Sequence, residues 1–167
     1  DPQAIRRVLR EAKPDVILNP AAYTAVDQAE QDERTATAIN GDAVAVMAEE
    51  AARLRALFVH YSTDYVFDGC KDGAYTETDT PNPQSAYGRS KLAGEQALQA
   101  SKADWLCLRT SWVYAARGKN FLRTILRLAA EREELRIVAD QVGAPTSARL
   151  IAEATAQTVS NAQHERS

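Results

Sequence analysis

Short apolar segments alternate with helical segments along this chain, and the alternation restricts the folds open to it. Apolar runs with β-branched residues occur at 15–19, 57–63, 105–114 and 135–140. Runs of this kind are typical of buried strands, and strands separated by helices usually pair in parallel. Nearly continuous apolar strands indicate that both sheet faces are covered. We therefore predict an α/β fold with a doubly wound, mostly parallel sheet and helices on both faces.

The predicted helices have identifiable ends. The first begins with Asp1, a favourable N-cap type, and Pro2 in the first turn, and it stops before Pro14. A loop at 20–27 follows the first strand, and a longer one at 64–84 contains glycines, prolines and several aspartates. Long loops in compact domains tend to be functional. The helices are expected at 1–13, 32–55, 86–101, 119–134 and 147–159.

Composition excludes several classes of function. The chain has 167 residues, enough for a domain with a real core, and a net charge of -3, which argues against a dedicated nucleic-acid binder. Cys70 and Cys107 have no paired spacing, which favours a reducing cytoplasm. His60 and His164 are far apart, and neither CxxC nor HExxH occurs, so no metal site is predicted. No signal peptide or membrane-length apolar run is found, and we expect a cytoplasmic protein without membrane contact.

The segments after the predicted strands are the places to look for a site, because doubly wound sheets bind ligands beyond the carboxyl ends of their strands. Each segment also has a purely structural interpretation. Ser62 and Thr63 would simply cap a strand end, Trp112 would be a core aromatic, and Gly143 with Pro145 would form a turn. For the small residues of NPAAYTAVD, a tight turn with nothing bound is about as probable as a ligand site.

The stretch SAYGRSKLAGEQAL at 85–98 carries the strongest chemical pattern. Tyr87 and Lys91 are four residues apart and share one helix face. A phenol has a pKa near 10, but a neighbouring ammonium would lower it, so that Tyr87 could protonate an oxygen while hydride reaches the adjacent carbon. An isolated YxxxK more often marks two surface residues. Thr63, at a strand end 24 residues earlier, shifts the balance toward chemistry.

Five segments together resemble the dTDP-4-dehydrorhamnose reductase family, a branch of the extended short-chain dehydrogenase/reductases with a Rossmann-like fold. The resemblance covers essentially the whole chain, in the family's order and spacing. It implies reduction of the 4-keto group of dTDP-4-dehydro-L-rhamnose to dTDP-L-rhamnose with NADPH or NADH, a step toward cell-surface polysaccharide. The segments are DVILNPAAYTAVDQAE, HYSTDYVFDG, SAYGRSKLAGE, RTSWVY and DQVGAPTSA.

The same resemblance implies roles for individual residues. Asn40 would support a proton relay near the lysine, although a solvated helical asparagine is the simpler interpretation. The implied roles are catalysis by Thr63, Tyr87 and Lys91, substrate binding by Thr63, Asp64 and Trp112, and cofactor binding by Ala22, Tyr23, Thr24, Tyr87 and Lys91.

Two features depart from the family pattern. The glycine-rich turn and a C-terminal part are missing, so we expect residues 1–167 to be the central part of one NAD(P)-binding Rossmann-like reductase domain, truncated at both ends. Some members dimerise through a metal held partly by an acid just after the PTxA segment. Arg149 stands there, which argues against a metal-bridged dimer but leaves a plain homodimer open.

Two other functions fit the same residues. Epimerases and dehydratases acting on nucleotide sugars keep the Tyr–Lys pair but usually need additional acid and base groups, and net NAD(P)H consumption would separate them from a reductase. A non-catalytic subunit is also possible, since the regulatory subunit of methionine adenosyltransferase is similar to this family yet works by association. A shared fold does not fix a function. The intact set Thr63, Tyr87 and Lys91 favours the reductase.

Overall fold

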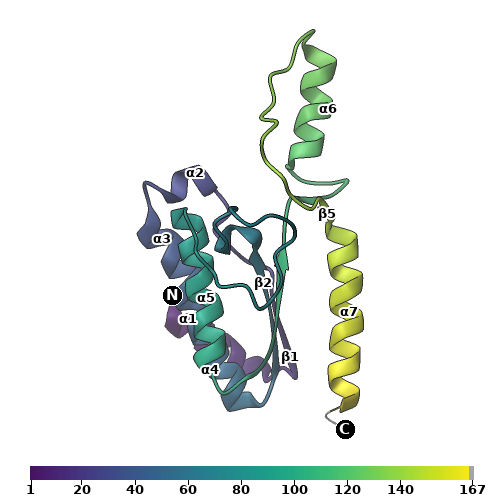
Figure 1. The fold of residues 1–167 in the computed structure, drawn as a ribbon. Helices are drawn as coiled ribbons and strands as arrows, with labels where there is room; N and C mark the ends of the chain where they lie inside the picture. Colours follow the sequence, from purple (N-terminus) through teal and green to yellow (C-terminus); the bar gives the residue numbers. More distant parts are fainter. Residues whose placement is uncertain (166–167) are drawn as a thin grey trace. The chain divides into compact units, whose positions relative to one another are not determined.

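The computed structural model describes residues 1–165 and divides the chain into two compact units, Asp1–Arg109 and the part that begins at Thr110. Figure 1 shows the elements of both units. The first unit contains α1 (Pro2–Ala12), β1 (Val16–Asn19), α2 (Val26–Ala29), α3 (Glu33–Thr37), the π-helical segment η1 (Ala38–Asp42), α4 (Ala43–Leu54), β2 (Leu57–Thr63), the 3-10 turn η2 (Asp64–Val66), α5 (Ala86–Ala100) and β3 (Asp104–Thr110). The second contains β4 (Val113–Tyr114), α6 (Phe121–Glu131), β5 (Thr146–Ser147) and α7 (Ala148–Glu165).

The predicted α/β class and parallel pairing are confirmed. Strands β1 and β2 pair in parallel, with Val16 opposite Leu57 and Asn19 opposite His60. Strand β3 lies on the other side of β2. In the second unit, β4 and β5 also pair in parallel. The carboxyl ends of β1 and β2 therefore lie side by side, as a ligand site in this fold class requires.

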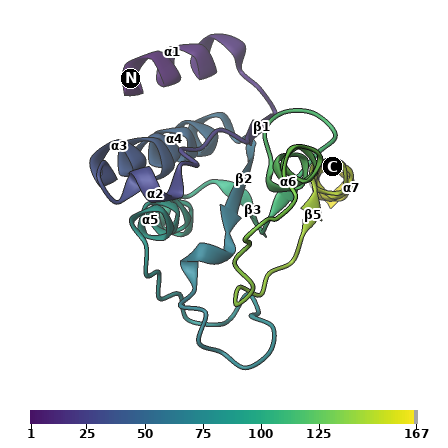
Figure 2. The same ribbon diagram turned by 90° about the horizontal axis from the view of Figure 1, so that it is seen from above.

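The core of the first unit lies between its sheet and helices α4 and α5. Ile17 and Phe58 are register partners, so both side chains point to the same sheet face. Figure 2 shows α3, α4 and α5 gathered on one side of β1 and β2. Because this cluster includes both strands and the end of α5, it holds α5 along β2. The buried members of the cluster are Ile17, Val44, Ala48, Ala51, Ala56, Phe58 and Leu98.

Several predicted helix ends are found. The Asp1 carboxylate accepts hydrogen bonds from the first-turn amides of α1, and Lys13 ends that helix in the left-handed region with φ 44°. The Ser85 hydroxyl caps α5 by accepting from the Gly88 amide at 3.0 Å. None of the helices within residues 1–165 is both long and apolar enough to cross a membrane.

The strand predicted at 135–140 is wrong. These residues form no regular structure, and two short strands, β4 and β5, pair instead. Ile137 and Val138 are 49% and 67% exposed, so an apolar run here does not signify a buried strand. In the described part of the second unit no strand pairs with this segment, and a periodic pattern cannot supply that partner. Two smaller differences are a helical turn, α2, which begins at the end of the predicted loop at 20–27, and the extension of α7 to Glu165.

Helix α1 is fastened to α4 by a buried carboxylate. Arg10 donates to Glu50 at 2.8 Å and Arg6 donates to it at 3.2 Å, while the Glu50 side chain is only 2% exposed. Hydrogen bonds from Arg10, opposed by burial, lower the Glu50 pKa from 4.5 to about 2. Because the folded-state pKa is depressed, this stabilisation is present above pH 4.5 and is lost as pH falls toward 2.

We expect Glu50→Gln to lower the free energy of unfolding at neutral pH, because the amide carries no charge for the two guanidinium groups. The difference in the free energy of unfolding between the variant and the unmodified protein should become smaller as pH falls from 4.5 toward 2. Urea unfolding followed by circular dichroism over this range measures it. Glu49→Gln is the matched control, because Glu49 pairs with Arg6 but is 62% exposed. Equal effects of the two substitutions at neutral pH would contradict the prediction.

Candidate active site

Helix α5 carries a line of residues along β2. Positions 87, 91, 94 and 98 recur every three or four residues, so they share one face of the helix. At one end of this line Leu98 packs in the same cluster as Phe58. At the other end Tyr87 forms a hydrogen bond with Thr63, the last residue of β2. Core packing thus delivers Tyr87 to the carboxyl end of the strand.

Thr63 has two functions in this arrangement. Its hydroxyl accepts from the Tyr65 amide at 3.2 Å and donates to the Asp64 carboxylate at 3.1 Å. The structural interpretation, a hydroxyl that caps the end of a strand, is therefore correct. The same hydroxyl also contacts the Tyr87 phenol, while the rings of Tyr65 and Tyr87 meet edge to face at 5.5 Å. The cap consequently fixes the position of a chemically useful group.

The expected lowering of the Tyr87 pKa is wrong for this structure. Burial is the main influence and raises the pKa of Tyr87; the hydrogen bond with Thr63 acts against it, and the charge of Asp64 adds to it. Tyr87 therefore keeps its proton at neutral pH. A group that donates a proton to a substrate must start in this protonated state.

Lys91 is held by β2. It is 2% exposed, and its ammonium donates to the Tyr61 carbonyl at 2.6 Å and lies 3.3 Å from Nε2 of His60. Burial lowers the pKa of Lys91 to about 8, with Cys107 and Glu95 opposing this shift. Because Lys91 follows Tyr87 by one turn on the same face of α5, these contacts hold its ammonium on the side of the helix that faces β2.

Asn40 ties the loop after β1 to helix α5. It is 0% exposed, so the interpretation as a solvated helical residue is wrong. Its Oδ1 accepts from the Tyr23 amide at 2.8 Å, and its Nδ2 donates to the Tyr23 carbonyl at 3.1 Å and to Ser90 Oγ at 2.9 Å. Asn40 belongs to the π-helical segment η1, and such segments are frequent at functional sites.

The residues expected to line a cofactor lie beside this anchor. Ala22 is half-buried and Thr24 is exposed, and Tyr23 and Tyr87 pack against the same small cluster of buried alanines. Within residues 1–165, the buried hydroxyl of Tyr23 has no hydrogen-bond partner. Buried hydroxyls are normally paired, so a polar group of a bound molecule fits this position.

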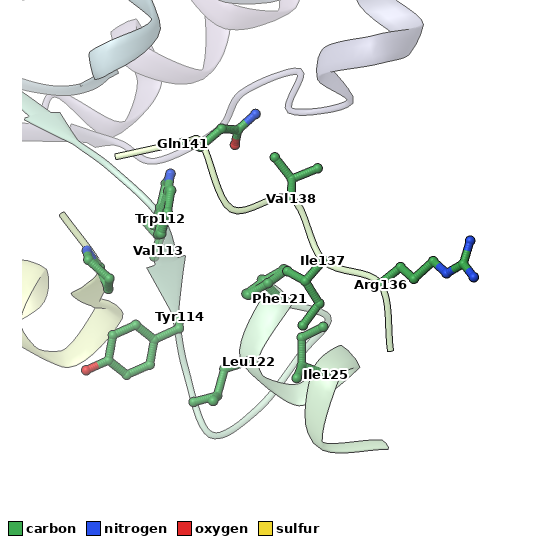
Figure 3. Close-up of a pocket in the computed structure, with 11 residues that line it drawn as sticks. Trp112, Val113, Tyr114, Phe121, Leu122, Ile125, Arg136, Ile137, Val138 and Gln141 are labelled. Carbon is green, nitrogen blue, oxygen red and sulfur yellow. The ribbon is translucent and has the colours of Figure 1, made fainter. Parts of the chain in front are cut away.

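Trp112 belongs to the second unit and lines a pocket there. Its backbone adopts φ 44°, an uncommon conformation for a residue with a side chain, and its side chain is 44% exposed rather than part of a core. A Cβ at Gly143 would lie 2.5 Å from the indole, so this glycine is needed for close contact and not only for a turn. The pocket, of about 850 Å³, is shown in Figure 3 and is lined by Trp112, Val113, Tyr114, Phe121, Leu122, Ile125, Arg136, Ile137, Val138, Gln141 and Pro145.

The sequence pointed to His60 and Arg149 for other reasons. His60 was noted only as an unsuitable zinc ligand, although a histidine inside an apolar strand was a visible signal. The position that a dimer-bridging acid would take holds Arg149, which pairs with Glu153 at 2.8 Å on the same helix. Over residues 1–165 no group of three or more histidines, cysteines or acids is placed to hold a metal ion.

A threonine, tyrosine and lysine at the carboxyl end of a parallel strand define the class as short-chain dehydrogenase/reductase-like. The chain belongs to the RmlD substrate binding domain family, which it matches over residues 1–167. It is 59% identical over 165 residues to a dTDP-4-dehydrorhamnose reductase of Burkholderia thailandensis, covering 99% of this chain and 55% of that protein. The chain thus spans about half the length of the curated relatives that it matches.

Solved structures agree with this assignment. A dTDP-4-dehydrorhamnose reductase from Clostridium acetobutylicum superposes with a TM-score of 0.93 at 39% identity, over 96% of this chain and 57% of that one. The enzyme of the same name from Bacillus anthracis, in complex with NADP, gives a TM-score of 0.85 at 41% identity, over 88% of this chain and 52% of that one. The predicted Rossmann-like fold is therefore confirmed.

Proposed function

We propose that the protein containing this chain reduces the 4-keto group of dTDP-4-dehydro-L-rhamnose to dTDP-L-rhamnose, using NADPH or NADH, in dTDP-rhamnose biosynthesis. The observation that carries the proposal is that Tyr87 contacts Thr63 at the end of β2, while Lys91, one turn further along α5, is held by the Tyr61 carbonyl of the same strand. The names of the similar proteins support the substrate, and the NADP of the Bacillus anthracis structure supports the cofactor. We further propose that it works in the cytoplasm, where the free thiols of Cys70 and Cys107 would stay reduced.

The residues of this chain have distinct roles in the proposed reaction. The bound nicotinamide supplies a hydride to C4 of the sugar. Tyr87 transfers its phenolic proton to O4, so that the ketone becomes an alcohol and Tyr87 is left as a phenolate. The Thr63 hydroxyl, already in contact with Tyr87, donates a hydrogen bond to the same oxygen. Lys91 stabilises the phenolate and binds ribose hydroxyls.

Substrate and cofactor contacts complete the proposal. Asp64, which accepts from Thr63 at 3.1 Å, lies where a sugar hydroxyl would approach the ketone-binding group. Ala22, Tyr23 and Thr24 form the proposed cofactor wall, with the buried Tyr23 hydroxyl as a donor to it. From the second unit, Trp112 supplies an exposed indole for the sugar nucleotide. We propose at most a homodimer without a bridging metal, since Arg149 pairs with Glu153.

Net consumption of the reduced cofactor tests the proposal. The full-length protein is mixed with dTDP-4-dehydro-L-rhamnose and NADPH or NADH, and loss of nicotinamide absorbance is compared with dTDP-L-rhamnose measured by liquid chromatography. We expect one molecule of product for each molecule of cofactor oxidised. A rearranged sugar without net oxidation would instead identify an epimerase. A stable protein partner captured in pull-downs, together with no turnover, would favour a regulatory subunit.

A further inference from the structure

A buried histidine beneath the Tyr–Lys pair has no part in the proposed chemistry. His60 sits in the middle of β2 and is 0% exposed. Its Nε2 lies 3.3 Å from the ammonium of Lys91. A fully buried imidazole in an otherwise apolar strand needs a hydrogen-bonding reason to be there, and Lys91 supplies one.

The protonation state of His60 follows from its surroundings. Burial, followed by the charge of Lys91, lowers the pKa of His60 to about 3, so the ring is neutral. A neutral imidazole has one donor and one acceptor nitrogen. A hydrogen bond with the backbone of Asn19 raises the pKa of the ring, as a ring N–H that donates to a carbonyl does, and the Asn19 side-chain amide lies 3.2 Å from Nδ1. The Lys91 ammonium has only donors, so Nε2, which lies 3.3 Å from it, must accept and the ring proton lies on Nδ1. The Asn19 amide then turns its oxygen, which is interchangeable with its nitrogen in such assignments, toward Nδ1.

We propose that His60, fixed by Asn19, is a positioning residue that accepts a hydrogen bond from Lys91 and sets which ammonium N–H faces the reaction site. Lys91 has three N–H donors. One is held by the Tyr61 carbonyl at 2.6 Å and one by His60 at 3.3 Å. Both partners belong to β2, so a single rigid strand fixes the rotation of the ammonium and leaves one N–H for a ligand.

Helix α5 and the neighbouring side chains of β2 pack against the imidazole of His60. A Cβ at position 94 would come within 3.5 Å of His60 Nε2, so α5 lies directly over the imidazole. The ring of Phe58 lies 6.2 Å away on the same strand face. The other titratable groups that act on Lys91 are Cys107 on β3 and Glu95 on α5, and Arg109 pairs with Glu95 at 2.6 Å. Among these groups, His60 alone is recorded as accepting a hydrogen bond from the ammonium.

A titration of Lys91 in the full-length protein, without substrate or cofactor, tests this role independently of catalysis. A hydrogen bond accepted from the ammonium favours its charged form. His60→Leu removes the acceptor, so we expect the Lys91 titration, followed by NMR with ¹³C-labelled lysine, to move down by about one pH unit, a tenfold change in the ionisation constant. His60→Gln, whose amide oxygen can take the place of Nε2, should restore most of the shift.

The design separates a positioning role from a packing role. His60→Asn retains a polar side chain but is too short to reach Lys91, so it should titrate like His60→Leu and serves in its place where the leucine variant does not fold. Equal Lys91 titrations in the unmodified, Asn and Gln proteins would overturn the inference. The inference depends on the proposed function only where it gives Lys91 a role in catalysis. If the full-length protein lacks reductase activity, the NMR result still decides whether His60 holds Lys91; if activity is present, we expect His60→Leu to raise KM for the cofactor more than it lowers kcat.

Discussion

Tyr87→Phe is expected to reduce turnover by about 10²- to 10⁴-fold, the usual contribution of a positioned proton donor. Phenylalanine keeps the ring that packs with Tyr23 on the alanine cluster and meets Tyr65 edge to face. It lacks only the hydroxyl that touches Thr63. Steady-state oxidation of NADPH by the full-length variant measures the loss, and quenching of protein fluorescence by NADPH measures whether cofactor binding is retained.

Tyr65→Phe is the matched control for this experiment. It removes the hydroxyl from the other ring of the same aromatic pair, and Tyr65 is 39% exposed. We expect its turnover to stay much closer to that of the unmodified protein. Turnover by Tyr87→Phe at the level of Tyr65→Phe would remove Tyr87 from its proposed role, and reduction of the ketone would then need another proton donor.

Alternation of strands and helices predicted the architecture of the first unit well, because its apolar runs pair with one another and its helix ends carry capping side chains. The capping side chains of Asp1 and Ser85 mark the starts of two helices, and both make the expected hydrogen bonds. The strand predicted at 57–63 is found as β2, with the same bounds. The same kind of apolar run at 135–140 did not form a strand, because a strand exists only when a neighbour pairs with it.

The candidate site was predicted in outline but not in its electrostatics. The pattern at 87 and 91 correctly indicated one helix face, since positions i and i+4 of a helix lie on the same side. It could not indicate which way the ammonium turns. That direction depends on Tyr61 and His60, which lie about 30 residues away in the sequence and reach Lys91 only through tertiary packing. The burial that raises the Tyr87 pKa is likewise a tertiary property.

Helix α5 can approach the site so closely because two of its residues have no side chain. A Cβ at Gly88 would clash with the Tyr65 carbonyl, and a Cβ at Gly94 would clash with the Asn40 carbonyl. In both cases the obstructing atom is backbone, which cannot rotate away as a side chain can. The close approach brings η2 and η1 against the two turns of α5 that carry Tyr87 and Lys91, so these glycines support the site as well as the fold.

Gly94→Ala is therefore expected to destabilise the protein by about 2–3 kcal/mol. Alanine favours a helix over glycine by about 1 kcal/mol. Forcing a methyl group into a filled space costs about 1–3 kcal/mol and occasionally more, and a rigid carbonyl as the obstructing group places this case at the upper end. The steric cost should dominate because Asn40, with hydrogen bonds to Tyr23 and Ser90, cannot retreat without breaking them. Urea unfolding of the full-length variant measures the free energy, and the Lys91 titration should shift as well.

Two further substitutions make the result specific to the Asn40 carbonyl. Gln96→Ala changes an exposed position of the same helix and should leave stability almost unchanged. Gly41→Ala would place a Cβ 3.1 Å from the Ala93 side chain, where the neighbour is a methyl group in place of a carbonyl oxygen, so an intermediate loss is expected. The loss of stability should therefore increase with the rigidity of the obstructing atom, in the order Gln96→Ala, Gly41→Ala, Gly94→Ala. A Gly94→Ala protein as stable as Gln96→Ala would show that η1 and α5 do not approach as closely as their backbones indicate, and the anchoring of Tyr23 to Ser90 through Asn40 would lose its main support.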